Sequence, residues 1–414
     1  MTPDYNRTRR ACYFSYIAAA PIFCLPAMLF VTFQQMYDIP YALLGALVAL
    51  NFCTQLGVDL LFSFFPQCFN VKLTVRTMPL LTSLGLVVYA LVPTLWPSHA
   101  YAGLLAGTLL FSIASGLGEA LISPTIAALP SDNPDRDMSK LHSLYGWGVF
   151  GSVVVTTAFF YLFGTQNWMY LTLLLAILPL ISSLLYCTSP IPDLGTSHAG
   201  EAAAVTKRRR VGILLCVCCI FLGSAAENTM TNWISSYMEI SLGIPKTFCD
   251  IAGLALFALL LAGVRSVYAK WGKSIWRVMM VGMIGAAACY FVAGITPNAG
   301  VALAACVLTG CCTSMLWPGT LILMEENMPR LGVAAYALMA AGGDFGASVA
   351  PALMGVITDA VKVSDWGVQM TQALGLESPD QLGMKVGMLA SVAFPLLGAL
   401  LLLVMRRYFK RKTE

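Results

Sequence analysis

The chain has 414 residues, of which 58% are hydrophobic and 11% are charged, and its formal net charge is +4. Soluble domains carry about a quarter of their residues as charged side chains, so this chain has too few charges to cover a water-soluble surface. The composition excludes a soluble protein and indicates one that crosses the bilayer many times.

Twelve apolar segments are long enough to cross a bilayer as helices, which takes about 20 residues. In chain order they are 11–37, 41–66, 77–96, 101–129, 141–163, 168–186, 211–237, 248–269, 275–295, 301–324, 331–361 and 385–407. The sequence therefore predicts an all-α membrane protein with twelve transmembrane helices.

The loops between these segments differ in charge. Most of the 24 lysines and arginines fall at the chain ends and in every second loop, and the other loops hold almost none. Cytoplasmic loops carry such an excess, so both termini are predicted to be cytoplasmic. The basic run at 207–210 is interpreted as a determinant of this topology, and no nucleic-acid partner is expected.

A polar segment at 189–210 divides the predicted helices into two groups of six. Its SPIPD, GTSHAGEAAA and KRRR stretches are typical of a flexible connector. The domains are therefore predicted as an N-terminal six-helix bundle at 1–188, a cytoplasmic linker, and a C-terminal six-helix bundle at 211–414. A weak internal repeat supports this division, because GLGEALISP at 116–124 corresponds to CCTSMLWP at 311–318.

This organisation resembles the major facilitator superfamily, in which two pseudo-symmetric bundles open a midplane substrate site to each side in turn. Within it, three stretches are similar to the fucose permease branch of sugar–proton symporters. They are Gly118-Glu119 followed by Pro124, SMLWP at 314–318, and GGDFGASVAPALMGVITDA at 342–360. The resemblance implies proton-coupled import of a sugar or a similar small polar solute by alternating access.

The chain departs from the superfamily pattern in the loop after the second predicted helix. There, Gln67 and Asn70 stand where an acid and a glycine are usual. Other charges would then have to hold the cytoplasmic gate. Asp59 and Arg265 occupy matching positions in the two halves, so a gating role is predicted for both.

Acidic side chains at bilayer depth are candidates for function, because an ionisable group there costs at least about 2.5–3.5 kcal/mol. Glu119 has no Lys, Arg or His within four residues, and it is the first candidate for the coupling proton. The alternative is a protonated acid that only bonds a neighbouring helix. Glu227 and Asp344 are the other two proton-coupling candidates.

A second set of polar and aromatic side chains is predicted to bind the substrate. Amides donate to and accept from hydroxyl groups, and aromatic faces cover the C–H side of a sugar ring. Hydrogen bonding between helices explains the amides of 223–237 equally well. The predicted substrate-binding residues are Asn51, Gln55, Tyr145, Trp147, Glu227, Asn228, Asn232 and Trp317.

No Walker loop, nucleophile elbow or metal-ligand spacing is visible, so neither an enzyme nor an ATP-driven pump is expected, and no cofactor or metal is predicted. The predicted partners are a small-molecule substrate, protons and the lipid bilayer. Sodium is the alternative coupling ion. The chain is expected to be a monomer in a bacterial cytoplasmic membrane. Two rival functions stay open: a proton-coupled exporter of drugs or metabolites, and a non-transporting receptor or scaffold.

Overall fold

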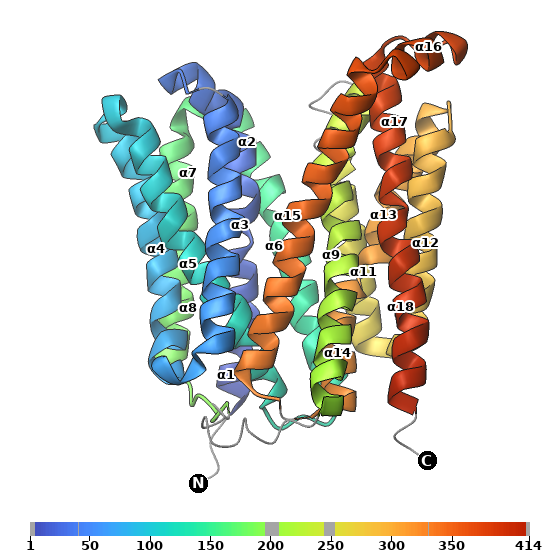
Figure 1. Cartoon of the computed structure of the whole chain (residues 1–414). Helices are drawn as coiled ribbons and strands as arrows, with labels where there is room; N and C mark the ends of the chain where they lie inside the picture. The colour runs from blue at the N-terminus through green and yellow to red at the C-terminus, as the bar shows by residue number, and fades with distance from the viewer. Residues whose placement is uncertain (1–4, 40, 195–206, 244–252, 330, 411–414) are drawn as a thin grey trace. The chain divides into compact units, whose positions relative to one another are not determined.

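The computed structural model describes residues 5–39, 41–194, 207–243, 253–329 and 331–410, which form helices joined by short turns (Figure 1). They belong to two compact units. The first comprises Met1–Val205 and Arg330–Ala341, and the second comprises Thr206–Pro329 and Gly342–Glu414. Most of the predicted linker lies outside the described residues, and the predicted domain limits stay a prediction.

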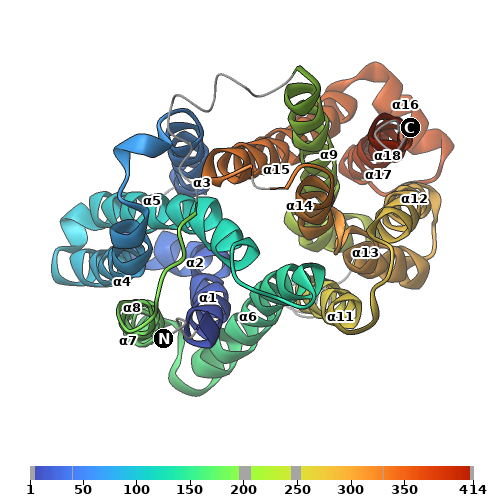
Figure 2. The same ribbon diagram turned by 90° about the horizontal axis from the view of Figure 1, so that it is seen from below.

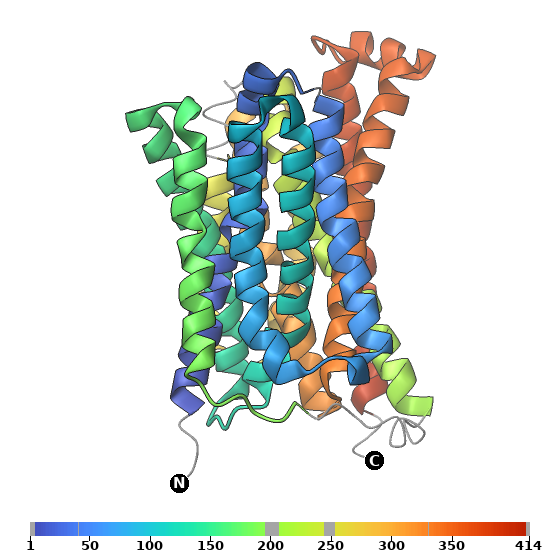
Figure 3. The same cartoon turned by 90° about the vertical axis from the view of Figure 1, so that its left-hand side faces the viewer.

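The first unit is a bundle in which α4 packs against α5, α7 and α8, α3 packs against α5, and α1 packs against α6 and α8. Figure 3 shows α8, α4, α5 and α3 as a row of neighbouring helices. The helices are α1 (Tyr5–Ala19), α2 (Pro21–Tyr37), α3 (Tyr41–Phe64), α4 (Val71–Leu95), α5 (Ala100–Ala127), α6 (Pro134–Phe163), α7 (Trp168–Leu175) and α8 (Ile177–Cys187).

Aromatic side chains form the core of this unit. Phe33, Tyr89, Phe111 and Trp168 are all almost fully buried. The rings of Phe33 and Trp168 meet edge to face with centroids 4.8 Å apart, an arrangement that aromatic pairs favour. This core joins α2, α4, α5 and α7 and holds the helices that carry the site in register.

In the second unit α12 packs against α13, α17 and α18, and α9 packs against α13, α14, α17 and α18 (Figure 2). Two tyrosines join α9 and α12 in opposite directions. The Tyr237 hydroxyl donates to the Ala293 carbonyl at 2.5 Å, and the Tyr290 hydroxyl donates to the Ala226 carbonyl at 2.8 Å. The helices are α9 (Lys207–Leu242), α11 (Leu256–Trp271), α12 (Ile275–Ile295), α13 (Ala299–Thr313), α14 (Leu316–Asn327), α15 (Val333–Val363, with residues of both units), α16 (Asp365–Ala373), α17 (Pro379–Ser391) and α18 (Ala393–Lys410).

Four segments predicted as single helices are broken, and each break lies just before a proline. Pro21, Pro179, Pro318 and Pro395 follow the breaks between α1 and α2, α7 and α8, α13 and α14, and α17 and α18. A proline has no N–H to give to the carbonyl four residues earlier, and its ring crowds that carbonyl. The helical bonding is therefore interrupted at these points.

Ten helical stretches among the described residues are long and apolar enough to cross a membrane. They correspond to the third to twelfth predicted segments. The first two predicted segments fold as α1, α2 and α3 but are not among the ten, and residues 248–252 of the eighth lie outside the described part of the chain. The all-helical prediction is confirmed, whereas twelve spans and cytoplasmic termini stay predictions.

Two glycines set the close approach of α4 and α5, and we expect that Gly85→Ala destabilises the protein. A Cβ atom at Gly85 would lie 2.7 Å from the Phe111 nitrogen and 2.9 Å from the Gly107 carbonyl oxygen. Because both neighbours are backbone atoms, the two helices must separate, at a cost of about 1–3 kcal/mol.

Thermal unfolding of the purified protein measures this cost. Gly151→Ala in α6 is the control, because a Cβ atom there has no neighbour within 4 Å. Equal unfolding midpoints for the two variants would show that the packing of α4 on α5 can give way.

Candidate functional site

A polar seam joins α3 and α5 in the first unit. The spacing of Asn51 and Gln55 puts both amides on one face of α3. Ser112 donates to the Asn51 side-chain oxygen at 2.6 Å, and Ser115 donates to the Gln55 side-chain oxygen at 2.8 Å. The Gln55 amide nitrogen donates to Asn51 Oδ1 at 3.0 Å. The seam therefore links the two helices by side chains that all have partners within the unit.

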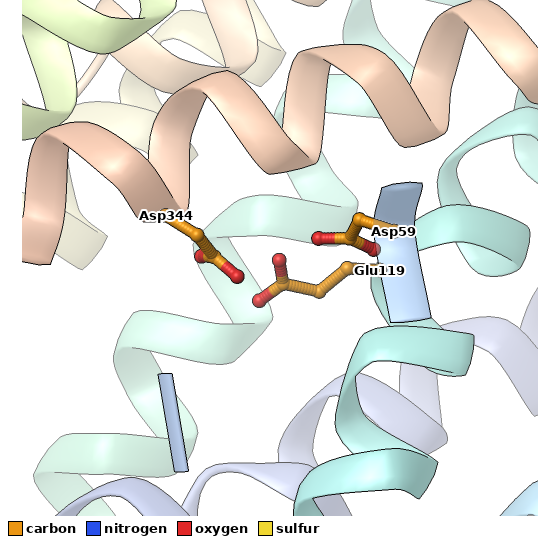
Figure 4. Close-up of side chains that lie close together, drawn as sticks. All are labelled: Asp59, Glu119 and Asp344. Atoms are coloured by element: carbon orange, nitrogen blue, oxygen red, sulfur yellow. The ribbon is translucent and has the colours of Figure 1, made fainter. Parts of the chain in front are cut away.

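The next residues along this face are the carboxyl groups of Asp59 and Glu119, which lie beside each other (Figure 4). Asp59 is fully buried and Glu119 is partly buried. One carboxylate oxygen of each lies within 4.8 Å of the other. Gly116 allows this approach, because a Cβ atom there would lie 3.1 Å from the Gln55 carbonyl oxygen.

The pair has the chemistry of a site that holds one proton. Two negative charges this close in an apolar bundle repel each other strongly. Glu119 Oε2 is buried and has no hydrogen-bond partner among the residues that the structure describes. An oxygen in that position can accept or release a proton without first breaking a hydrogen bond. Asp59 was predicted as a gating residue, and its position next to Glu119 was not foreseen.

A second cluster in the first unit was also missed from the sequence. Ser123 lies one helical turn after Glu119 on α5. Its hydroxyl is 3.1 Å from the Tyr16 hydroxyl of α1 and 3.5 Å from Nε2 of His142 on α6. The Tyr16 and His142 rings meet edge to face with centroids 5.3 Å apart. Glu119 and Ser123 are four residues apart, which puts them on one face of α5. This spacing is the one sequence signal that could have indicated the α1–α5–α6 cluster.

Charged groups continue the cluster towards the ends where α1 and α6 begin. The Asp137 carboxylate accepts from the Tyr13 hydroxyl at 3.2 Å and from the Ser131 hydroxyl at 2.8 Å. It also pairs with Arg9 at 3.2 Å. The Lys140 ammonium lies 4.9 Å from the centre of the Tyr13 ring. The Asp137 carboxylate thus accepts from several donors at this end of the cluster.

In the second unit, the candidates Glu227 and Arg265 form an ion pair. The Arg265 Nη2 lies 3.2 Å from Glu227 Oε2, and its Nε donates to the Ser314 carbonyl at 2.6 Å. That carbonyl lies four residues before Pro318, so it has no helical N–H to accept from. The helical bonding resumes with the Gly319 N–H, which donates to the Met315 carbonyl at 2.9 Å. Arg265 therefore joins α9 and α11 to the break between α13 and α14.

The predicted substrate-binding amides lie on α9 beside this pair. Asn228 donates to the carbonyl and hydroxyl oxygens of Ser224, both at 3.1 Å. Asn232 is exposed and donates to the Asn228 carbonyl at 2.8 Å. The amide nitrogens thus have backbone or side-chain partners on their own helix. Their role in binding stays a prediction.

Asp344 lies on α15 in the residues of the second unit and is buried; Figure 4 labels it too. Its neighbour Gly343 faces Trp317, because a Cβ atom at that glycine would lie 2.2 Å from the indole ring. Ser348 donates to the Asp344 carbonyl at 2.7 Å. The indole of Trp317 therefore packs against α15 at the residue that precedes the buried acid.

The two aromatic candidates of α6 differ in their surroundings. Tyr145 meets the ring of Phe23 edge to face at 5.6 Å. Trp147 is 40% exposed and meets Phe150 at 6.2 Å. Neither contact tests the substrate-binding role predicted for these residues.

Comparisons with known proteins agree on the fold. The family model for the Major Facilitator Superfamily matches residues 12–351. The chain is similar to a solved transporter of that superfamily, FucP in the outward conformation, with 14% identity and a TM-score of 0.72, over 94% of this chain and 98% of that one. A second solved structure of FucP, the E. coli fucose:proton symporter, also matches.

Two further solved structures are similar over nearly their whole length. The proton:xylose symporter XylE has 14% identity and a TM-score of 0.74, over 95% of this chain and 94% of that one. The human organic anion transporter MFSD10 has 14% identity and a TM-score of 0.68, over 97% of this chain and 100% of that one. No curated protein sequence matches the chain. At these identities the likeness concerns the fold alone.

Proposed function

The chain belongs to the Major Facilitator Superfamily, and from this premise we propose that it is a secondary active transporter that imports a sugar or a similar small polar solute together with protons. Membership makes it a multi-pass membrane transporter, in agreement with its ten apolar helical stretches. The proton, the polar solute and the inward direction are the proposed part.

The acid pair of the first unit carries this proposal. Asp59 and Glu119 are carboxyl groups within one apolar bundle, with oxygens no more than 4.8 Å apart. A structural hydrogen bond would need only one acid and a neutral partner. Two acids together favour a group that gains and loses a proton as its surroundings change, which is what coupling to a proton gradient requires. Glu227 and Asp344 are further candidates for this role.

The polar and aromatic side chains of the second unit support a polar solute. Asn228 and Asn232 offer amide oxygens, and Trp317 offers an aromatic plane. These groups suit a molecule with several hydroxyls. We assign the substrate contacts to these three residues, together with the predicted candidates of the first unit.

Uptake by proteoliposomes tests the function directly. Purified protein is reconstituted, and the uptake of labelled fucose, xylose and glucose is measured with an imposed pH gradient, with a sodium gradient, and with neither. We expect accumulation of at least one sugar only when the outside is acidic. Accumulation driven by sodium alone would show that sodium, and not the proton, is the coupling ion. No uptake of any sugar under any gradient would refute sugar import.

Asn228→Ala, Asn232→Ala and Trp317→Ala are each expected to weaken the apparent affinity for the transported sugar. A lost amide partner costs about 1–3 kcal/mol, and Trp317→Ala removes the aromatic plane that would cover the sugar ring. Asn327→Ala is the matched control. Its amide donates to the Leu323 carbonyl at 2.8 Å, just as Asn232 donates to Asn228 at 2.8 Å.

Equilibrium exchange at several sugar concentrations, normalised to the amount of reconstituted protein, gives the affinities. If all three variants match Asn327→Ala, the sugar binds elsewhere.

A proton-coupled exporter of drugs or metabolites is the alternative. It is favoured by the similarity in fold to the human organic anion transporter MFSD10. The buried guanidinium of Arg265 would suit an anionic solute. Proteoliposomes loaded with labelled organic anions distinguish the two, since an exporter would release the anion when the outer medium is made acidic.

A further inference from the structure

The α1–α5–α6 cluster lies between the acid pair and the charged residues at the start of α1 and α6. We propose that it is the path by which the Glu119 proton reaches that end of the first unit, with His142 as the relay. The proposal rests on the proposed function, because it concerns the proton that the transporter would couple to its solute. All residues of the path belong to one unit.

The path begins at Glu119 and reaches the imidazole of His142 through Ser123. In its second step, the Ser123 hydroxyl lies 3.5 Å from His142 Nε2. The first step spans one helical turn of α5, a separation of about 5–6 Å between Cβ atoms. In this proposal one water molecule bridges the gap and conducts the proton.

Each step moves one proton, and each group that gives up a proton receives another. The Glu119 carboxyl releases its proton through the bridging water to the Ser123 oxygen, while the Ser123 hydroxyl gives its own proton to His142 Nε2. The imidazole becomes an imidazolium and then returns to neutral by releasing the proton of its other ring nitrogen to water on the side of the charged residues. The ring is then in its other neutral tautomer, and a ring flip resets it for the next proton. Serine and histidine suit these steps because each can both donate and accept.

The outer end of the path is charged. Tyr16 and Tyr13 lie one turn apart on α1, and Tyr13 donates to Asp137 at 3.2 Å. Asp137 pairs with Arg9, whose side chain is 22% exposed. The charged side chains that contact this end of the cluster include Asp137, Arg9 and Lys140. The positive-inside bias predicts that this end faces the cytoplasm, where an importer would release its proton.

A purely structural role of the cluster predicts a different experimental result. If Tyr16, Ser123 and His142 only held three helices together, removing the imidazole would lower stability without changing how fast Glu119 exchanges its proton. The rate of proton exchange at Glu119 therefore separates the two roles, and its measurement needs no substrate.

Infrared spectroscopy of the lipid-embedded protein provides that rate. The protein is moved from H₂O to D₂O in mildly acidic buffer, and the shift of the Glu119 carboxyl band is followed in time. The band is assigned by its loss in Glu119→Gln. We expect His142→Gln to slow the exchange at least about tenfold, since a positioned acid–base group contributes a factor of about 10² or more. Ser123→Ala, a smaller change, is expected to slow it as well.

Ser83→Ala is the matched control. Its hydroxyl also makes a buried bond between helices, to the Ala176 carbonyl at 2.8 Å, and it belongs to the same unit. We expect Ser83→Ala to exchange at the wild-type rate. If His142→Gln and Ser123→Ala both exchange the Glu119 proton as fast as Ser83→Ala does, the relay proposal is wrong.

A second measurement keeps this result apart from the proposed function. Sugar-driven acidification is recorded with a pH-sensitive dye inside proteoliposomes. Absence of any sugar-driven proton flux in the wild type would refute proton-coupled sugar import, whereas the infrared result would still decide on the relay. If the wild type couples, His142→Gln is expected to reduce the proton flux and the net uptake about tenfold, while sugar exchange is unchanged.

Discussion

Glu119→Gln is expected to abolish proton-driven accumulation of the transported sugar and to leave its exchange across the membrane largely intact. Glutamine keeps the size and one oxygen of the acid, but it cannot take up or release a proton. The carrier would still bind and release the sugar on both sides, because no other contact of the first unit is removed. Without a proton to carry, it would only equilibrate the sugar.

Two assays on the same proteoliposomes check this prediction. Net uptake under an inward proton gradient should fall to the level without a gradient, and exchange of labelled for unlabelled sugar should stay within about twofold of the wild type, a difference of roughly 0.4 kcal/mol. Asp380→Asn is the control, because this exposed acid pairs with Lys362 at 2.7 Å outside the acid pair. If Glu119→Gln accumulates the sugar to the wild-type level, another acid couples the proton to transport.

The second large effect concerns the ion pair of the second unit. Arg265→Met leaves the Glu227 carboxylate without its cation and the Ser314 carbonyl without a donor. Glu227→Gln leaves the guanidinium without a counter-charge. Removing one partner of a buried pair costs about 3–5 kcal/mol, so each single variant is expected to be strongly destabilised. The double variant should lose less than the sum, because no unpaired charge remains.

Thermal unfolding of the four proteins forms a double-mutant cycle. Arg265 is almost fully buried, whereas the side chains of the Lys362 and Asp380 pair are 47% and 40% exposed. A parallel cycle on that exposed pair is the control, and it is expected to show little coupling. If the stability losses of the two single variants simply add up in the double variant, the interaction between Arg265 and Glu227 contributes nothing to stability.

The fold could be predicted from the sequence because it depends on segment length and hydrophobicity. The resemblance to the superfamily is confirmed by the family match over residues 12–351. The breaks within four predicted helices were not foreseen, although each precedes a proline that was visible in the sequence. Apolar length alone cannot report them, since a broken helix is as hydrophobic as a continuous one.

The site could be predicted only in part. The four-residue spacing of Asn51, Gln55 and Asp59 indicates a shared helical face. Which helix packs against that face is a question of tertiary structure, so the contact with α5 could not be derived. The partner of Arg265 was equally hidden, because Glu227 lies on another helix.

His142 illustrates the same limit. In the sequence it stands in an ordinary stretch, and the three histidines of the chain are far apart. Its importance arises only where α1, α5 and α6 meet and bring Tyr16 and Ser123 to its ring. Interactions of this kind leave no periodic pattern, so no reading of one helix at a time could find them.

The bond from Arg265 to the Ser314 carbonyl has a consequence for the evolution of this chain. Pro318 creates the need for a donor, and Arg265 meets it at 2.6 Å. A descendant that replaced Pro318 with a residue bearing an N–H would close the helix over that carbonyl and remove one of the two demands on the guanidinium, leaving the pairing with Glu227 as the other. A descendant that lost Arg265 first would strand the carbonyl in an apolar bundle. The order of substitution is thus constrained, and the two positions should vary together across homologous sequences, with proline lost before arginine.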